Sequence, residues 1–287
     1  MSSFIKSPLN YIGGKYKTLP QIFPLFPQDI DCFVDLFAGG ANVGINSNAK
    51  KIILNDNLVY LIDMYETLTK KSKKEVLRYV EGVINQFELS LTNTDGYNRL
   101  REQYNTVRNP IDLLILTFFS FNHQIRFNNN HQFNTPFGRN RSHYNESIKN
   151  NLIGFLDALH NKKVDFYKDE FDKFNLSKLT SNDFVYCDPP YLITVGSYND
   201  GKRGFTGWGE KQEKKLLAIL DELNIRGIRF ALSNVLTHKN AQNDLLQSWI
   251  DKNNYNVHKV DNDFSNSNYH TSVHSKEATQ EVLITNY

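Results

Sequence analysis

The pattern with the most specific chemistry is Asp188-Pro189-Pro190-Tyr191, which directly follows the apolar run 183–187. Such a run is typical of a buried strand, and open α/β sheets bind ligands at the carboxyl ends of their strands. Two consecutive prolines fix two φ angles, so they would hold the Asp188 carboxylate and the Pro189 carbonyl as a rigid acceptor pair. The ring of Tyr191 could stack on a bound base. The alternative is an ordinary Pro-Pro turn that ends a strand, with Asp188 as a cap.

A rigid acceptor pair suits the two hydrogens of an exocyclic amine such as the N6 of adenine. That amine is a poor nucleophile because its lone pair is delocalised into the ring. Acceptors for both hydrogens favour a pyramidal nitrogen and aim its lone pair outward, so catalysis would come from orientation and electrostatics. This chemistry requires no metal, and His123, His131 and His143 lack the spacing of metal ligands.

A second pattern, at 35–44, indicates a nucleoside site. Asp35 lies in the apolar run 32–36, and a glycine-rich stretch follows it. Glycines at such a place let the backbone turn tightly and approach a ligand. The stretch has neither the GxGxxG nor the P-loop pattern. Asn55-Asp56 follows the next apolar run, and an acid about 20 residues after a glycine turn commonly binds ribose hydroxyls. The alternative is a plain turn with an exposed aspartate.

Strands and helices must alternate to position these residues, and the sequence predicts that alternation near both ends of the chain. Predicted strands cover 32–36, 51–54, 164–167, 183–187, 228–232, 256–260 and 281–286, and predicted helices cover 60–89, 111–123, 151–160, 210–223 and 243–252. A helix is also expected after the glycine turn, and Ser233-Asn234 is expected at a strand end. The segment 122–144 indicates a polar loop or β-hairpin. The fold class is therefore α/β, with a mostly helical insertion in the middle.

Composition excludes several classes of protein. The chain has 287 residues, of which 40% are hydrophobic and 22% charged, as in a globular soluble protein. Its net charge of +2 says little about partners. Cys32 and Cys187 both lie in apolar runs, so they give neither a disulfide framework nor a zinc pattern. We expect reduced thiols in a cytoplasmic protein. The segment 1–8 is too polar for a signal peptide, and no membrane span is expected.

Together these residues resemble the α-group of DNA adenine-N6 methyltransferases, which includes bacterial DNA adenine methylases and the partners of restriction enzymes. The similar segments follow the order of that group: Phe4 to Lys15, ending in Tyr11-Ile12-Gly13-Gly14-Lys15; Asp35 to Gly40; Asn55-Asp56; Arg126 to Arg139; and Asp188 to Tyr191. The resemblance covers most of the chain, though it is weak over 61–109 and 258–275.

The resemblance implies a Rossmann-like S-adenosylmethionine-dependent methyltransferase sheet in 1–60 and 164–287. It also implies a mostly helical target-recognition domain in 61–163 that carries a β-hairpin. S-adenosylmethionine is the implied cofactor, and the residues implied to contact it are Tyr11, Lys15, Asp35, Phe37, Gly39, Asp56, Asp169, Phe171 and Asp188. The N-terminal segment would contact its methionine end and Asp56 its ribose. An acid just before a Phe would contact its adenine, and of Asp169 and Glu170 we favour Asp169.

The implied substrate is adenine in double-stranded DNA, flipped out of the helix to reach Asp188. Residues expected to contact DNA are Arg126, Asn128, Asn134, Arg139, Lys202 and Arg203. For each basic residue the alternative is a solvated surface charge. A cognate restriction endonuclease is a possible partner, without a stable complex being implied.

Other functions remain as alternatives. Cytosine-N4 enzymes more often have Ser in place of Asp188, and RNA or protein-glutamine enzymes more often have Asn. Asp188 therefore favours adenine in DNA over the amino groups of those substrates. A non-catalytic DNA-binding protein with this fold is the alternative from another class. Cytosine-C5 chemistry is rejected because Cys187 precedes Asp188 on a strand, and a zinc deaminase because its H-x-E and PCxxC patterns are missing.

Overall fold

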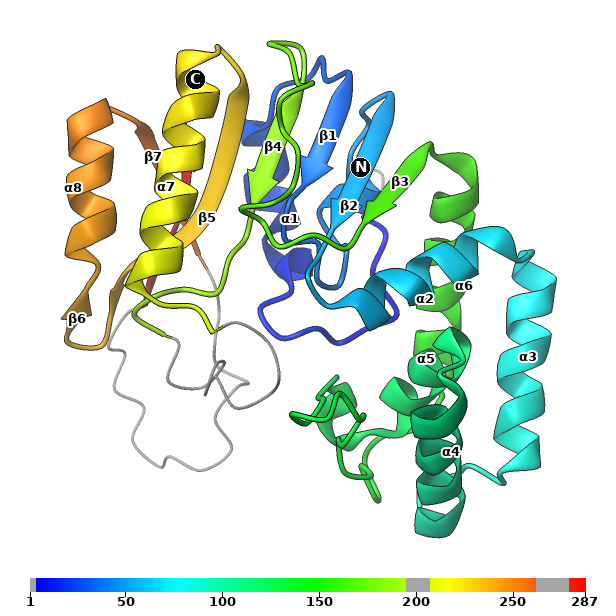
Figure 1. Cartoon of the computed structure of the whole chain (residues 1–287). Coiled ribbons are helices and arrows are strands. Elements are labelled where there is room, and N and C mark those ends of the chain that lie inside the picture. Colours follow the sequence, from blue (N-terminus) through cyan, green and yellow to red (C-terminus); the bar gives the residue numbers. More distant parts are fainter. Residues whose placement is uncertain (1–3, 195–206, 262–278) are drawn as a thin grey trace.

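The computed structural model describes residues 4–194, 207–261 and 279–287, and its strands form one sheet (Figure 1). The strands are β1 (Cys32–Asp35), β2 (Lys51–Asn55), β3 (Val164–Tyr167), β4 (Phe184–Cys187), β5 (Arg229–His238), β6 (Ala241–Gln242), β7 (Asn256–Val260) and β8 (Gln280–Thr285). The α-helices are α1 (Leu19–Ile22), α2 (Val59–Lys70), α3 (Lys73–Gln86), α4 (Thr94–Val107), α5 (Pro110–Phe119), α6 (Glu146–Asn161), α7 (Glu210–Ile225) and α8 (Asp244–Asn253). Short 3₁₀ turns are η1 (Lys15–Thr18), η2 (Phe23–Leu25), η3 (Gly44–Asn46) and η4 (Phe121–His123).

The strand order is β3-β2-β1-β4-β5-β8-β7, with β6 paired to β5. Strands β1 to β5 pair in parallel, whereas β8 is antiparallel to both β5 and β7. The expected α/β class is confirmed, and the sheet is mostly parallel. The strand order reverses between β1 and β4, which is the switch point where open α/β sheets bind ligands.

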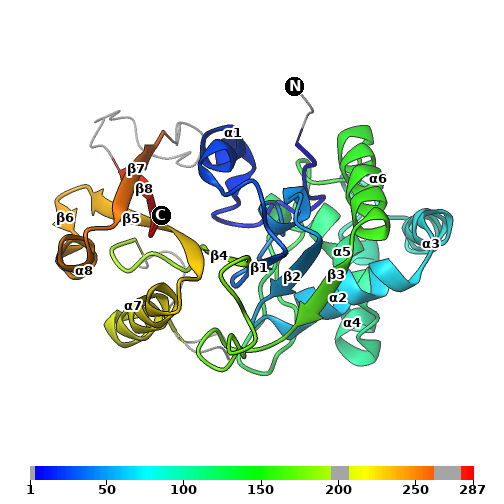
Figure 2. The same ribbon diagram turned by 90° about the horizontal axis from the view of Figure 1, so that it is seen from above.

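The sheet is covered on both faces, which explains why its strands are continuous apolar runs. Side chains of a strand alternate between faces. Phe33 and Phe184 therefore pack with α1 and its neighbouring turns, while Val34 and Val185 pack with α7 and α8. Figure 2 shows α1 and α7 on opposite sides of β1 and β4.

The helical insertion packs directly on the sheet. Ile52 and Leu54 of β2 share one apolar cluster with buried residues of α2 to α6. At its centre, α5 begins at the side-chain cap of Asn109 and buries every residue from Ile111 to Phe119. The carboxyl ends of the parallel strands lie on the same side of the sheet, and α4 and α5 extend beyond those ends (Figure 1). The insertion is therefore placed to border whatever binds at the carboxyl ends of the strands.

Some elements differ from the sequence-based expectations. The glycine turn leads only into the three residues of η3 rather than into a helix, because β2 already begins at Lys51. The helix expected over 60–89 is divided at Ser72, whose side chain forms a capping box with Glu75 and starts α3. The expectation that Ser233-Asn234 ends a strand was wrong, since β5 continues to His238.

Cys32 is half-buried, Cys187 is buried, and both are free thiols. Across the three described ranges, no group of three or more His, Cys, Asp or Glu side chains is arranged to hold a metal ion. Within the same ranges, no helix has the length and apolar character needed to cross a bilayer.

Candidate active site

The switch point brings two aspartates together at the carboxyl ends of neighbouring strands. Asp35 ends β1 and pairs in register with Tyr186 of β4, so Asp188 follows just beyond the end of β4. Asp35 Oδ2 accepts a hydrogen bond of 2.9 Å from the Gly44 amide. In the described part of the chain, its buried Oδ1 has no hydrogen-bond partner. Burial raises the pKa of Asp35 to about 8. A buried carboxylate oxygen without a partner is suited to a cationic group from a ligand.

The glycine turn lies beside Asp35 and leaves no space for a larger residue. Gly39 has a φ of +46°, and a Cβ there would lie 2.9 Å from two ring atoms of Tyr11. The Gly39 amide donates to Asp56 Oδ2 at 2.8 Å, and the Tyr65 hydroxyl donates to its carbonyl at 2.7 Å. These hydrogen bonds hold the turn in place. Because glycine has no side chain, a ligand can approach the backbone of the turn closely.

The side chains of Asp56 and Asn55 form hydrogen bonds with different parts of the backbone. Asp56 also accepts from the Leu58 amide at 2.9 Å, so each of its oxygens accepts one bond and retains a second lone pair. Burial raises the pKa of Asp56. The Asn55 amide group bonds the Leu36 carbonyl and both backbone groups of Asp169, each at 3.0 Å. Asn55 thus ties the glycine turn to the segment after β3.

Three aromatic rings form an apolar surface next to this segment. Phe37 of the glycine turn lies 5.5 Å from Phe171 and 5.6 Å from Trp208, and Phe171 and Trp208 are 5.3 Å apart. Asp169, two residues before Phe171 in the sequence, has an exposed side chain. A group of aromatic rings can accommodate a flat heterocycle.

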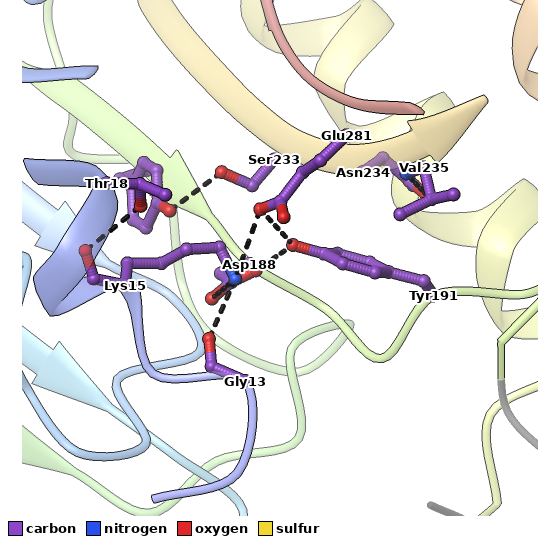
Figure 3. A network of polar contacts seen from close by, with 10 residues as sticks. Gly13, Lys15, Thr18, Asp188, Tyr191, Ser233, Asn234, Val235 and Glu281 are labelled. Carbon is purple, nitrogen blue, oxygen red and sulfur yellow. Dashed lines mark hydrogen bonds and ion pairs between the residues drawn. The ribbon is translucent and has the colours of Figure 1, made fainter. Parts of the chain in front are cut away.

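The Asp188 carboxylate is held by two donors (Figure 3). Lys15 Nζ lies 2.8 Å from Asp188 Oδ2, and the Tyr191 hydroxyl donates to Oδ1 at 2.9 Å. Lys15 comes from the N-terminal segment, also donates to the Gly13 carbonyl at 2.8 Å, and is only 6% exposed. Asp188 is 17% exposed. The carboxylate is therefore oriented but still accessible from one side.

The segment expected to contact DNA folds back on itself through isolated antiparallel pairings rather than through regular strands. Phe127 pairs with Phe133, and Phe127 stacks on Tyr60 with ring centroids 4.4 Å apart. Asn128 Oδ1 accepts from the amides of Asn130 and Gln132, both at 3.0 Å. The Asn128 side chain thus stabilises the turn.

The other residues expected to contact DNA differ in exposure. Arg126 is half-buried, and within the described ranges its buried Nε has no hydrogen-bond partner. Asn134 and Arg139 are exposed. Lys202 and Arg203 lie outside the described residues. Arg126 is consequently the member of this group with a buried donor available to a ligand.

Comparison with known proteins identifies the family. The profile of the D12 class of N6 adenine-specific DNA methyltransferases matches residues 11–266. The chain belongs to this D12 class. It is 53% identical over 286 residues to the Type II methyltransferase M.FokI of Planomicrobium okeanokoites, covering 100% of this chain and 43% of the relative. It is 51% identical over 284 residues to the modification methylase StsI of Streptococcus sanguinis, covering 99% of this chain and 43% of the relative.

A shorter relative matches over most of its own length. The chain is 27% identical over 256 residues to the DNA adenine methylase of Salmonella typhi, covering 88% of this chain and 86% of the relative. The chain thus spans less than half of M.FokI and StsI. The family resemblance drawn from the sequence is confirmed.

Two acidic side chains of this D12-class site were missed by sequence reasoning. Glu213 is buried and accepts from Trp208 Nε1 and Asn234 Nδ2, both at 2.8 Å, so it fixes the indole ring of the aromatic group. Burial raises the pKa of Glu213. Glu281 is 3% exposed and contacts both Tyr191 and Lys15. The available signal was an acid inside each of two otherwise apolar patterns, the stripe of α7 and the strand β8.

Proposed function

We propose that this chain transfers a methyl group from S-adenosylmethionine to the N6 amino group of adenine at specific sites in double-stranded DNA. The observation that carries the proposal is the fixed Asp188 carboxylate at the switch point, where Asp35 Oδ1 also has no hydrogen-bond partner among the described residues. Membership of the D12 class supports the adenine N6 as the target.

The cofactor is expected to lie over the switch point. Asp35 Oδ1 would accept from its ammonium group, and Asp56 would use its remaining lone pairs for the ribose hydroxyls. Phe37 and Phe171 would enclose the adenine, with Asp169 near its amino group. Tyr11 and Lys15 would contact the methionine part of the cofactor. When bound, S-adenosylmethionine supplies an electrophilic methyl group on a sulfonium.

The residues of the chain would bind and orient the amine. The Asp188 carboxylate and the Pro189 carbonyl would each accept one N6 hydrogen, which directs the nitrogen lone pair toward the methyl donor. The Tyr191 ring would stack on the flipped base, a contact worth about 1–3 kcal/mol. The N6 nitrogen would bond to the methyl carbon as the bond from that carbon to sulfur breaks, so the nitrogen would become positively charged and a negative environment would lower the barrier. One N6 hydrogen would then leave as a proton, which Asp188 would accept and pass to solvent.

We further propose that residues 61–163 form the target-recognition domain and that 1–60 and 164–287 form the catalytic domain. The position of α4 and α5 beyond the carboxyl ends of the strands supports this division. The names of the relatives, Type II methyltransferase and modification methylase, support a role in a restriction-modification system with a cognate endonuclease. Such a protein would act on DNA in the cytoplasm.

The direct test is transfer of labelled methyl from S-adenosylmethionine to unmethylated duplex DNA, followed by digestion to nucleosides. N6-methyladenine is the expected product, and sequencing that detects this base would reveal the recognition site. Label in N4-methylcytosine, label in RNA but not in DNA, or duplex binding without any transfer would each contradict the proposal and support one of the alternatives.

Cofactor affinity is predicted to rise with pH toward pH 8. The pKa of Asp35 is about 8 in the free protein, so below that pH the carboxyl is mostly protonated. Pairing with an ammonium group requires the carboxylate, so binding must release a proton. Affinity should therefore increase by up to about tenfold per pH unit between pH 5.5 and 7.5. Calorimetric titration with S-adenosylhomocysteine in buffers of different ionisation enthalpy would measure both affinity and proton release.

The matched variant for that experiment is Asp35→Asn, which keeps the shape of the side chain but cannot ionise. Its affinity should be low and nearly independent of pH over the same range. A slope that is the same in both proteins would show that Asp35 does not meet the ammonium group.

Replacing Arg126 with alanine is predicted to weaken binding to the cognate duplex by about 1–3 kcal/mol and to reduce discrimination against mismatched sites. Its Nε is buried and has no hydrogen-bond partner among the described residues, so it would be available as a donor to DNA. Fluorescence anisotropy on cognate and mismatched duplexes would measure both effects. Arg78→Ala, an exposed position on α3, is the control. Equal affinities for wild type and the Arg126 variant on both duplexes would refute this assignment.

A further inference from the structure

Glu281 stands out as a buried acid that the proposed chemistry does not use. It lies in β8, where it pairs with Val235 of β5 and Val260 of β7. Its side chain is 3% exposed and points toward Tyr191, Lys15 and Asp188 (Figure 3). A buried carboxylate is costly unless it is paired. Its position in the centre of this network therefore calls for a functional explanation.

Glu281 and Asp188 share the same two donors. The Tyr191 hydroxyl lies 2.9 Å from Asp188 Oδ1 and 3.1 Å from Glu281 Oε1. A phenol hydroxyl has one proton, so it can donate fully to only one of these oxygens at a time. Lys15 Nζ is 2.8 Å from Asp188 Oδ2 and 3.6 Å from Glu281 Oε1. The single phenol proton is therefore shared between the two carboxylates, and the ammonium charge lies between them, closer to Asp188.

This sharing changes what Asp188 can offer to a substrate. A carboxylate is a weaker acceptor for a third donor when it is already paired with an ammonium group and accepts a hydrogen bond from a phenol. Glu281 attracts both donors toward itself and so leaves Asp188 a stronger acceptor. With all three groups ionised, Lys15, Asp188 and Glu281 carry a net charge of −1. Without the charge of Glu281 the remaining pair would be neutral.

We infer that Glu281 is a positioning residue for methyl transfer, which keeps Asp188 available to the amine and makes the site negative where the nitrogen becomes positive. The inference rests on the proposed function. Among the described residues, Glu281 contacts Lys15 and Tyr191, which both contact Asp188. Because Glu281 would act on the amine through these residues, its effect should fall on the chemical step rather than on binding.

The test is Glu281→Gln, which keeps the size of the side chain and an acceptor for Tyr191 but removes the charge. The rate constant for methyl transfer in a single turnover, and with it kcat, should fall by about tenfold or more. The steady-state KM values for DNA and cofactor should stay within about twofold of wild type. Glu281→Asp, which keeps the charge, should recover at least about half of the lost rate on a logarithmic scale.

Asp112→Asn is the matched control. Asp112 is a fully buried acid of α5 that accepts a 2.8 Å hydrogen bond from the Tyr79 hydroxyl. It lies between Ile111 and Leu113, which belong to the apolar cluster of the helical insertion. It should lower the thermal midpoint about as much as Glu281→Gln while kcat stays within about twofold of wild type.

Three outcomes would overturn the inference while leaving the proposed function intact. These are a normal kcat in Glu281→Gln, equal losses in Glu281→Gln and Glu281→Asp, or the same loss of kcat in Asp112→Asn. By contrast, no N6-methyladenine formation by the unaltered chain would refute the proposed function itself, and the inference with it.

Discussion

Replacing Asp188 with alanine is expected to lower kcat for methyl transfer by about 10³-fold or more while duplex binding stays within a few-fold of wild type. Removal of one oriented polar group that acts on the transition state costs about 10²–10³ in kcat. Asp188 is expected to cost more, because it would orient the amine and also counter its developing charge. Single-turnover transfer of labelled methyl groups would measure the loss, and anisotropy with a labelled duplex would measure binding.

Asp188→Asn is the informative companion variant. It keeps one acceptor oxygen but removes the charge that pairs with Lys15 at 2.8 Å. We expect it to retain more activity than the alanine variant and far less than wild type. Near-normal turnover by Asp188→Ala would mean that the amine is bound elsewhere, and the acceptor pair of Asp188 and Pro189 would have to be abandoned.

Much of the sheet could be predicted because its strands are buried on both faces. The runs that became β1, β2 and β4 each contain at least three consecutive apolar residues, so they were recognised directly. The helix α4 was missed because its surface is mostly polar and only Gly96, Tyr97, Leu100 and Tyr104 are buried. The helix expected after the glycine turn does not form, since too few residues separate Gly44 from β2.

The candidate site was predictable where its residues are adjacent in the sequence. Asp188 to Tyr191 and the glycine turn each form one local pattern, and the strand order brings them together. The contacts of Asp188 with Lys15 and of Tyr191 with Glu281 join opposite ends of the chain. No spacing rule reports such contacts, because they depend on which strands become neighbours.

The segment 126–139 shows a different limit of sequence reasoning. Asn128 and Arg126 are both polar residues of a loop, and the sequence gives them the same expected role. The structure separates them, because the Asn128 side chain bonds its own turn while the Arg126 Nε has no partner among the described residues. Asn and Arg differ here because a short amide readily bonds nearby backbone, whereas a long guanidinium reaches beyond it.

Lys15→Met is predicted to lower the free energy of unfolding by about 3–5 kcal/mol, toward the lower end because Asp188 is 17% exposed. Methionine fills the space of the lysine stem but removes the ammonium group that lies between the carboxylates of Asp188 and Glu281. Lys15 is 6% exposed, so water cannot readily replace its charge. Urea unfolding monitored by circular dichroism would measure the loss, provided that the m-value is unchanged.

A second substitution separates this electrostatic cause from lost packing. In Lys15→Met combined with Glu281→Gln, one of the two uncompensated charges is removed, so the double variant should be more stable than Lys15→Met alone. The interaction energy from the double-mutant cycle should exceed about 1 kcal/mol, as for residues of one ion-pair network. Strictly additive losses would show that Lys15 stabilises the protein through its stem alone. A stabilising interaction would instead support a lysine held between Asp188 and Glu281 as the link between the N-terminal segment and the carboxyl ends of the strands.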